Sequence, residues 1–199
     1  TDGLMKQSAS FAAGSTTALT TNSASHDAFG RVLTQVDART GTVTYNGYLE
    51  NGSLTGMTDA GGRTTAYTYD NMGRTIAVDA PDTTTVVNGV NVTLANVTHT
   101  SYNLTGTVAG TWGDQTYARF NVYDAQNRLV ELRTYQDLAH GTKPTFATTG
   151  FASTKWNYDS QRGRLDNKRY DDNKGTDYTY TTAGRLNTRE WATRTYSVR

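Results

Sequence analysis

Few residues in this chain of 199 have the types and spacing that catalysis or metal binding requires. His26, His99 and His140 are far apart in the sequence, and none belongs to an H-E-x-x-H zinc motif. Residues 171–177 place oxygen-bearing side chains at alternate positions, as a calcium loop does. They also coincide with an expected turn, where the same residue types are needed, so we predict a turn and assign no metal and no cofactor.

Glutamates that could act in glycoside hydrolysis are scattered at Glu50, Glu131 and Glu190. Such chemistry needs two carboxylates at a defined separation in space, which a sequence does not give. Each of the three lies in or beside an expected strand, where a solvated or arginine-paired role is favoured. There is no G-x-S-x-G elbow and no nucleotide-binding glycine loop. We therefore assign no catalytic residue, and a polysaccharide-active enzyme stays an alternative.

Aromatic side chains are the remaining candidates for ligand binding. The chain has 3 tryptophans and 13 tyrosines, which could stack on sugar rings. Most tyrosines follow a repeat, which indicates packing between strands. Trp112 lies off that repeat, in an expected loop Gly110-Thr111-Trp112-Gly113, and is the candidate ligand contact.

Composition limits the class of protein. Only 35% of residues are hydrophobic, and 19 glycines accompany many threonines and tyrosines, which suit half-exposed strands joined by tight turns. The net charge of +1 gives no electrostatic footprint for nucleic acid or anionic membrane. No apolar stretch is long enough for a membrane-spanning helix. The absence of cysteine favours a bacterial source.

A short tyrosine–aspartate segment recurs along the chain. Its type form is Tyr69-Asp70-Asn71-Met72-Gly73-Arg74, and a degenerate copy covers residues 48–53. Anchored on the final position, the copies fall at 31, 53, 74, 128, 164 and 185, which indicates a unit of about 21 residues with insertions in two steps. The predicted motif residues are Asp27, Gly30, Arg31, Tyr69, Asp70, Gly73, Arg74, Tyr123, Asp124, Arg128, Tyr158, Asp159, Gly163, Arg164, Tyr180, Gly184 and Arg185.

The motif has the chemistry of a β-hairpin turn. Asp at the first turn position can accept hydrogen bonds from the backbone ahead of it, and Gly near the end tolerates the left-handed conformation. A second series of turns follows Asp37, Asp59 and Asp79, so each unit has two strands and two turns. We expect the repeat arginines to pair with repeat aspartates along neighbouring hairpins, which would fix strand register. An anion site at the arginines is the alternative.

These patterns predict an all-β chain of tandem antiparallel hairpins in a curved or spiralling sheet. Residues 1–25 are expected to form a weakly structured or edge-strand segment. Residues 26–199 are expected to form the repeat domain, with insertions at about 81–122 and 136–152. Within the first insertion, Asn88-Gly89 predicts a hairpin. Thr195-Tyr196-Ser197 looks like the start of a further repeat strand, which indicates a piece of a longer protein.

The Y-D-x-x-G-R-L pattern at this spacing resembles the YD/RHS repeats of bacterial Rhs proteins, of shell subunits in insecticidal toxin complexes and of teneurins. The resemblance covers residues 20 to 199. It implies a β-sheet that spirals into a hollow shell able to enclose a toxin polypeptide. Family shells are much longer than this chain, and the aspartyl self-cleavage region that ends many Rhs cores has no counterpart here.

Two functions follow as hypotheses. In the first, the chain is a structural segment of a secreted or cell-surface bacterial shell, and its partners are other repeats of the same longer chain and an enclosed toxin or effector polypeptide. In the second, it is an extracellular adhesion or carbohydrate-binding module that uses exposed aromatics, Trp112 above all, to bind a glycan.

Overall fold

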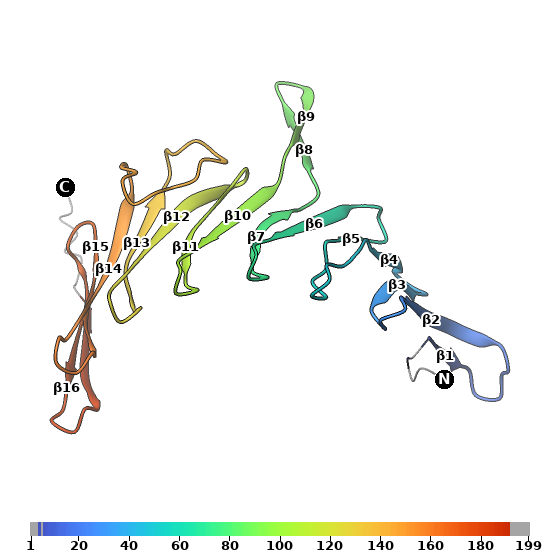
Figure 1. Cartoon of the computed structure of the whole chain (residues 1–199), viewed down its shortest axis with the longest axis horizontal. Helices are drawn as coiled ribbons and strands as arrows, with labels where there is room; N and C mark the ends of the chain where they lie inside the picture. The colour runs from blue at the N-terminus through green and yellow to red at the C-terminus, as the bar shows by residue number, and fades with distance from the viewer. Residues whose placement is uncertain (1–3, 5, 192–199) are drawn as a thin grey trace, which may run out of the picture. The chain divides into compact units, whose positions relative to one another are not determined.

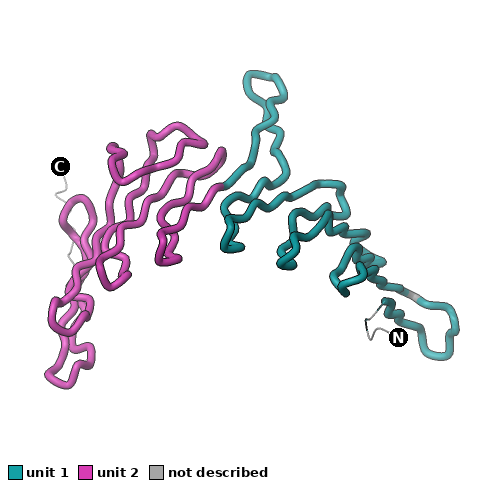
Figure 2. Tube along the Cα trace, in the orientation of Figure 1, with its two compact units in different colours: residues 1–98 teal, residues 99–199 magenta. Residues whose placement is uncertain are grey.

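A computed structural model describes residue 4 and residues 6–191, and in this part of the chain the secondary structure is entirely β (Figure 1). The all-β antiparallel fold predicted from the sequence is therefore confirmed. The chain divides into two compact units, residues 1–98 and residues 99–199 (Figure 2). Tyr196, on which the expectation of a further repeat strand rests, lies outside the described residues.

In unit 1, seven strands follow one another in chain order, each antiparallel to the next. They are β1 (Gln7–Phe11), β2 (Ala18–His26), β3 (Val32–Asp37), β4 (Gly41–Tyr45), β5 (Gly56–Thr58), β6 (Thr64–Tyr69) and β7 (Thr75–Asp79). The degenerate copy at residues 48–53 lies between β4 and β5, where Tyr48 and Leu54 form an isolated bridge. The N-terminal segment, residues 1–25, contains β1, whose five residues are all exposed, and all of β2 except His26.

A separate two-stranded hairpin, β8 (Thr83–Val87) with β9 (Val90–Leu94), projects from the sheet (Figure 1). Its turn is made by Asn88 and Gly89, with φ of 51° and 78°. Two successive positive φ angles suit the twist of a two-residue hairpin turn. The hairpin that Asn88-Gly89 predicts is therefore confirmed.

In unit 2, the strands again follow chain order. They are β10 (Val97–Tyr102), whose first two residues belong to unit 1, then β11 (Val108–Gly113), β12 (Thr116–Tyr123), β13 (Leu129–Tyr135), β14 (Ala152–Tyr158), β15 (Leu165–Tyr170), β16 (Gly175–Tyr180) and β17 (Leu186–Trp191). The long link between β13 and β14 contains no strand or helix.

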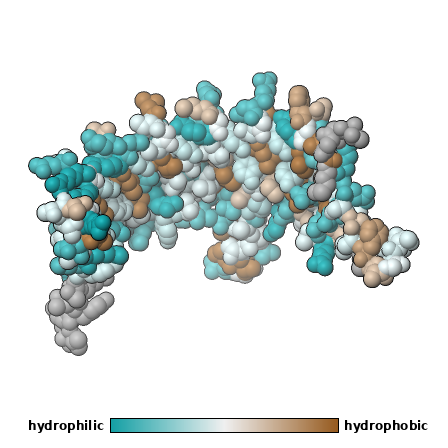
Figure 3. Space-filling model, turned by 90° about the horizontal axis from the view of Figure 1, so that it is seen from below, coloured by the Kyte–Doolittle hydropathy of each residue, from teal (hydrophilic) through white to brown (hydrophobic). Residues whose placement is uncertain are grey.

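The sheet has little hydrophobic core. Among the described residues, the buried hydrophobic side chains are Ala118 and Tyr135. Figure 3 shows hydrophobic side chains as small separate patches between hydrophilic ones. Cross-strand hydroxyl pairs such as Thr58–Thr64, at 3.0 Å, and Thr179–Thr188, at 2.6 Å, occupy positions that apolar pairs hold in other sheets. The low hydrophobic content of the sequence therefore reflects a sheet whose two faces are largely exposed.

Unit 2 is thicker where the link after β13 folds back onto the sheet. Tyr135 is fully buried there, edge-on to Phe151 at a centroid distance of 5.7 Å. The Arg133 guanidinium carbon lies 4.6 Å from the ring centroid of Phe146 and 4.5 Å from that of Phe151. Arg133 also forms an ion pair with Glu131 at 2.9 Å. Burial raises the pKa of the Tyr135 hydroxyl.

Candidate functional site

The recurring turn has one hydrogen-bond pattern, seen in full at Asp70. The Asp70 N–H donates to the Arg74 carbonyl and the Gly73 N–H donates to the Asp70 carbonyl, both at 2.9 Å. One carboxylate oxygen of Asp70 accepts the backbone N–H groups of Met72 and Arg74, at 2.9 Å each. The other accepts Nε of Arg74 at 2.7 Å. Aspartate is needed because a single carboxylate satisfies two backbone donors and the arginine together.

The same pattern is repeated at Asp27, Asp59 and Asp124. Each carboxylate lies 2.7 Å from the arginine four residues later. Hydrogen bonds from the side chain and backbone of Arg74 hold the pKa of Asp70 below its ordinary value. The pKa of Asp124 is lowered chiefly by the backbone hydrogen bond from Arg128, and that of Asp59 chiefly by the one from Arg63. At Asp27, burial raises the pKa, but the Arg31 hydrogen bonds outweigh it and the pKa is lowered.

These ion pairs correct the expectation that repeat arginines pair with aspartates of neighbouring hairpins. Arg31, Arg74 and Arg128 each pair with the aspartate of their own turn. The reason is geometric, because the turn brings residues four apart onto one side, within hydrogen-bonding distance of each other. The pairs therefore close individual turns and do not link hairpins into a ladder.

What links one turn to the next is a contact between arginine and tyrosine. The guanidinium carbon of Arg31 lies 4.7 Å from the ring centroid of Tyr48, and that of Arg128 lies 4.4 Å from the centroid of Tyr158. Arg164 lies 4.7 Å from the centroid of Tyr180 in the same way. In each case the tyrosine opens the following copy of the motif. Arg31 and Arg128 thus each close their own turn through the aspartate and stack on the tyrosine of the next turn.

The tyrosines that open the copies donate their hydroxyls back to the preceding turn. Tyr69 donates to the Leu54 carbonyl at 2.7 Å, and Tyr180 donates to the Leu165 carbonyl at 2.9 Å. The acceptor is the residue that directly follows the end of the preceding motif. Three further bonds repeat this rule, at Tyr48 to Val32, Tyr123 to Val108 and Tyr158 to Leu129. We call the tyrosine hydroxyl bond together with the arginine–tyrosine contact the interlock.

The motif glycine also serves the interlock. Gly163 has a φ of 68°, and a Cβ there would lie 2.9 Å from Nη1 of Arg128 in the preceding turn. Gly184 has a φ of 83°, and a Cβ there would lie 3.5 Å from Nη1 of Arg164. Glycine is thus required for the left-handed backbone and, at Gly163, for the close approach of the arginine.

The turn at residues 158–164 differs because it has one extra residue. The Asp159 N–H still donates to the Arg164 carbonyl, at 2.8 Å, and the Asp159 carboxylate accepts the Gln161 N–H at 2.9 Å, as Asp70 accepts that of Met72. This turn, which lies wholly within the described part of the chain, lacks the ion pair with the arginine. Nε and Nη1 of Arg164 are buried without a hydrogen-bond partner among the described residues. Thr181 replaces Asp in the last turn, and its hydroxyl accepts the Arg185 N–H at 3.1 Å. The hydroxyl thus makes only one of the bonds that Asp70 makes.

Sequence reasoning missed a copy of the turn between β10 and β11. The Asn103 N–H donates to the Thr107 carbonyl at 2.8 Å, and the Gly106 N–H donates to the Asn103 carbonyl at 2.9 Å. Tyr102-Asn103-Leu104-Thr105-Gly106-Thr107 keeps Tyr and Gly in place and puts Asn for Asp and Thr for Arg. This copy divides the longest step, from 74 to 128, into 33 and 21 residues. We propose that the insertion predicted at residues 81–122 is confined to the β8–β9 hairpin and its flanks.

The candidate ligand contact, Trp112, lies in strand β11 and not in a loop, which corrects the sequence expectation. Its ring is half-buried and stacks on His99 with a centroid distance of 5.3 Å and an interplanar angle of 18°. The Lys143 ammonium lies 5.5 Å from the indole centroid. Trp112 is therefore part of the packing between the sheet and the link after β13, and a ligand contact there stays a prediction.

Residues 171–177 contain the turn between β15 and β16. The Asn173 N–H donates to the Tyr170 carbonyl at 2.9 Å, and Asn173 has a φ of 57°. Asp171 accepts the Ser153 N–H and hydroxyl at 2.8 Å, whereas Asp177 pairs with Arg169. Across the described residues, no three His, Cys, Asp or Glu side chains are grouped as a metal site would need.

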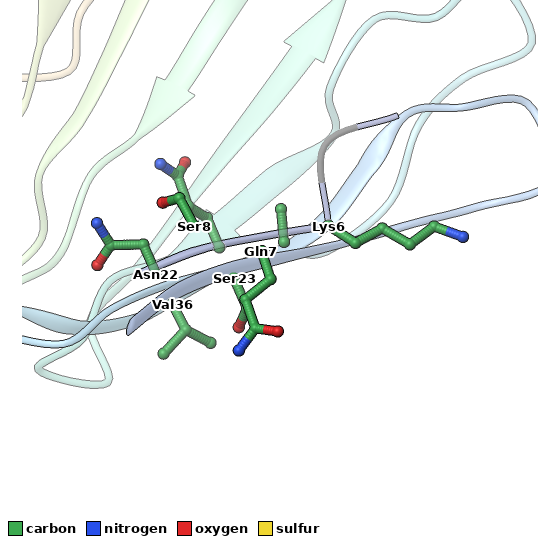
Figure 4. A pocket seen from close by; sticks show the side chains of 8 residues that line it. Lys6, Gln7, Ser8, Asn22, Ser23 and Val36 are labelled. Carbon is green, nitrogen blue, oxygen red and sulfur yellow. The ribbon is translucent and has the colours of Figure 1, made fainter. Parts of the chain in front are cut away.

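Cavities in the sheet are small or open. The pocket in Figure 4, between β1, β2 and β3, has a volume of about 60 Å³ and is lined by residues such as Lys6, Asn22 and Val36. Ligand pockets in proteins usually measure roughly 300–1,000 Å³ and are concave. A larger hollow of about 430 Å³ lies between the turns at residues 27–31 and 48–53, lined by Phe29, Arg31 and Tyr48. Two of its lining residues, Arg31 and Tyr48, belong to the interlock.

Known proteins resemble this chain in sequence and fold. Residues 48–85 match the model of the RHS Repeat family. None of the curated proteins matches.

Among solved structures, TcdB2-TccC3 without its hypervariable C-terminal region has a TM-score of 0.40 and 18% identity over 86% of this chain and 10% of that chain. The Photorhabdus luminescens Tc holotoxin pore has a TM-score of 0.34 and 16% identity over 90% of this chain and 12% of that chain. This chain thus spans about a tenth of the length of the structures it matches. The matched segment, residues 48–85, includes the turn at Asp70, and the hydrogen-bond pattern of that turn is repeated at Asp27 before it and at Asp124 after it.

Proposed function

We propose that this chain is a structural segment of a longer wall of RHS repeats that encloses or presents another polypeptide, such as a toxin. The observation that carries the proposal is the interlock. In five copies the tyrosine hydroxyl binds the carbonyl of the residue that follows the preceding turn. At three of these boundaries the preceding turn's arginine also stacks on that tyrosine. A contact of this kind can be extended copy by copy, as in other repeat proteins.

The proposed role is mechanical and not catalytic. In the described residues, the motif carboxylates of Asp27, Asp70 and Asp124 are engaged in their own turns, where they stabilise the backbone. Arg31 and Arg128 are engaged by those carboxylates and by tyrosine rings. The residues that dominate the sequence pattern thus support the sheet.

A secreted or cell-surface, bacterial location is part of the same proposal and rests on the RHS repeat match. None of the described residues forms a helix that is long and apolar enough to cross a membrane. Carbohydrate binding at Trp112 has no specific support in the contacts of that residue, so it is not developed as a second function.

The test uses the full natural protein that contains these residues. We expect repeats to continue beyond the 199 residues and a second segment of the chain, or a co-expressed polypeptide, to resist protease while the wall is intact. Exchanging Tyr69 for Ala should open the wall and expose that polypeptide, because it removes the hydroxyl bond by which this copy holds the Leu54 carbonyl of the preceding one. Tyr117→Ala is the matched control, since Tyr117 is 61% exposed. A natural protein no longer than this chain, or equal protection in both variants, would contradict the proposal.

A further inference from the structure

One face of the last four strands of unit 2 combines aromatic rings with cations. Cross-strand partners lie on the same face of a sheet. Trp156 lies opposite Lys168, and Tyr178 lies opposite Arg189. Thr176 lies opposite both Lys168 and Trp191, which places β14 to β17 in one continuous row. We call this surface the cationic face, and it is formed by Trp156, Lys168, Tyr170, Tyr178, Arg189 and Trp191.

Each cation on this face is held between two rings. The Lys168 ammonium lies 5.5 Å from the Trp156 centroid and 5.0 Å from the Tyr170 centroid. The Arg189 guanidinium carbon lies 4.5 Å from the Trp191 centroid and 6.0 Å from the Tyr178 centroid. The rings orient the cations without neutralising them, because an aromatic quadrupole carries no net charge.

The two faces of these strands differ in how their charges are satisfied. On the opposite face, Arg169 pairs with Asp177, and Lys155 and Glu190 give that face a balanced charge. On the cationic face, neither Lys168 nor Arg189 forms an ion pair with another described residue. In β15, the acidic residue two positions before Lys168 is Asp166. It lies at the end of the strand next to the turn, beyond the register shift between Asn157 and Tyr158.

The hydrogen-bond donors and acceptors of the cationic face indicate the charge of a molecule that would bind there. Lysine, arginine and tryptophan are donors only, and an ionised carboxylate is an acceptor only. The six side chains of the face include no amide and no carboxylate. Sugar hydroxyls need acceptors as well as donors, and among these six side chains only the two tyrosine hydroxyls can accept a hydrogen bond. The flat rings favour apolar groups beside the charges, and Trp191 is 62% exposed.

We propose that the cationic face binds an acidic stretch of polypeptide, whose carboxylates pair with Lys168 and Arg189 while its apolar atoms pack on the rings. The choice of polypeptide over another carboxylate polymer rests on the proposed function, since a wall that encloses a polypeptide presents its faces to one. The pairing itself rests on the charges and rings of the face.

The test measures fluorescence anisotropy of a labelled peptide that alternates glutamate with leucine and glycine, titrated with the whole 199-residue chain at low and high salt. We expect binding at low salt, loss at high salt, and no binding of the same peptide with glutamine for glutamate. The double variant Lys168→Gln and Arg189→Gln should bind about tenfold more weakly. Lys155→Gln with Arg162→Gln is the control, because it removes the same charge from the opposite face and a turn.

The charge-retaining variant Lys168→Arg with Arg189→Lys should keep the affinity, which separates loss of charge from loss of fold. Equal weakening in the control would overturn the proposal, since it would reveal non-specific charge attraction. Stronger binding of polyuronate or single-stranded DNA than of the peptide would overturn it too. If the peptide does not bind but the full protein still protects an enclosed polypeptide from protease, the inference fails and the proposed function stands.

Discussion

The hydroxyl of Tyr180 donates a 2.9 Å hydrogen bond to the backbone carbonyl of Leu165, across the boundary between two hairpins. Tyr180 opens one copy of the repeat, and Leu165 follows the end of the copy before it. The tyrosine that marks each copy in the sequence is therefore a contact to the previous copy. Where Arg31, Arg128 or Arg164 ends a copy, the arginine contacts the tyrosine of the next copy, so the two ends of the motif contact opposite neighbours.

Removing one hydroxyl should weaken the sheet measurably. Tyr69→Phe leaves the ring in place and deprives the part-buried Leu54 carbonyl of its 2.7 Å donor. We expect a loss of about 1 kcal/mol in the free energy of unfolding, measured by urea titration. Tyr117→Phe should change it little, because that side chain is 61% exposed. Equal losses in the two variants would show that the hydroxyl bond to Leu54 does not contribute.

The close approach at Gly163 should make it less tolerant than Gly184. Both have positive φ, so an alanine at either position costs about 1–2 kcal/mol in backbone strain. At Gly163 the new Cβ would also meet Nη1 of Arg128 at 2.9 Å. Arg128 cannot retreat freely, because Asp124 and Tyr158 both hold it. We expect Gly163→Ala to lower the urea midpoint further than Gly184→Ala, and the reverse order would contradict the contact.

Acid should destabilise the turns. The pKa values of Asp27, Asp70 and Asp124 lie below the ordinary value of 3.8 in the folded chain. A depressed carboxyl pKa contributes stability above the unfolded pKa and loses it as the pH falls through the folded value. The urea midpoint should therefore hold from neutral pH down to about pH 4 and fall below it. Asp70→Asn should lower the midpoint at neutral pH and reduce the acid-dependent fall.

Asp166→Asn is the control for the acid titration, because Asp166 forms no ion pair with the described residues. It should leave both the neutral midpoint and the acid-dependent fall nearly unchanged. A fall of the same size in wild type and in Asp70→Asn would mean that the turn carboxylates do not set the acid sensitivity.

Much of this organisation could be predicted from local chemistry. The turn at Asp70 follows from the side-chain preferences of four positions, and the hairpin at Asn88-Gly89 follows from two. The partner of each arginine could not be predicted, because choosing between Asp124 and the next copy's Asp159 depends on how far the guanidinium reaches from its own turn. The copy at Asn103 is hard to recognise in the sequence because Thr107 replaces the arginine that ends the other copies and Asn103 replaces the aspartate.

The surroundings of Trp112, the candidate ligand contact, could not be predicted from the sequence. Glycines on both sides suggested a loop, yet Gly110 lies in a strand, where a Cβ would lie 2.9 Å from the Arg119 carbonyl. The glycine thus allows close approach of a neighbouring strand. The contacts of Trp112 with His99 and Lys143 join residues that are far apart in the sequence, and no local pattern encodes them.

The central claim, that successive copies hold each other through the interlock, is tested most directly by a double-mutant cycle between Arg164 and Tyr180. This pair is suitable because Arg164 makes no ion pair within its own turn, so its contact with Tyr180 can be isolated. The single variants Arg164→Met and Tyr180→Leu and the double variant are compared by urea unfolding. The interlock predicts a coupling energy of about 0.5–1 kcal/mol. Additive losses, with no coupling, would contradict it.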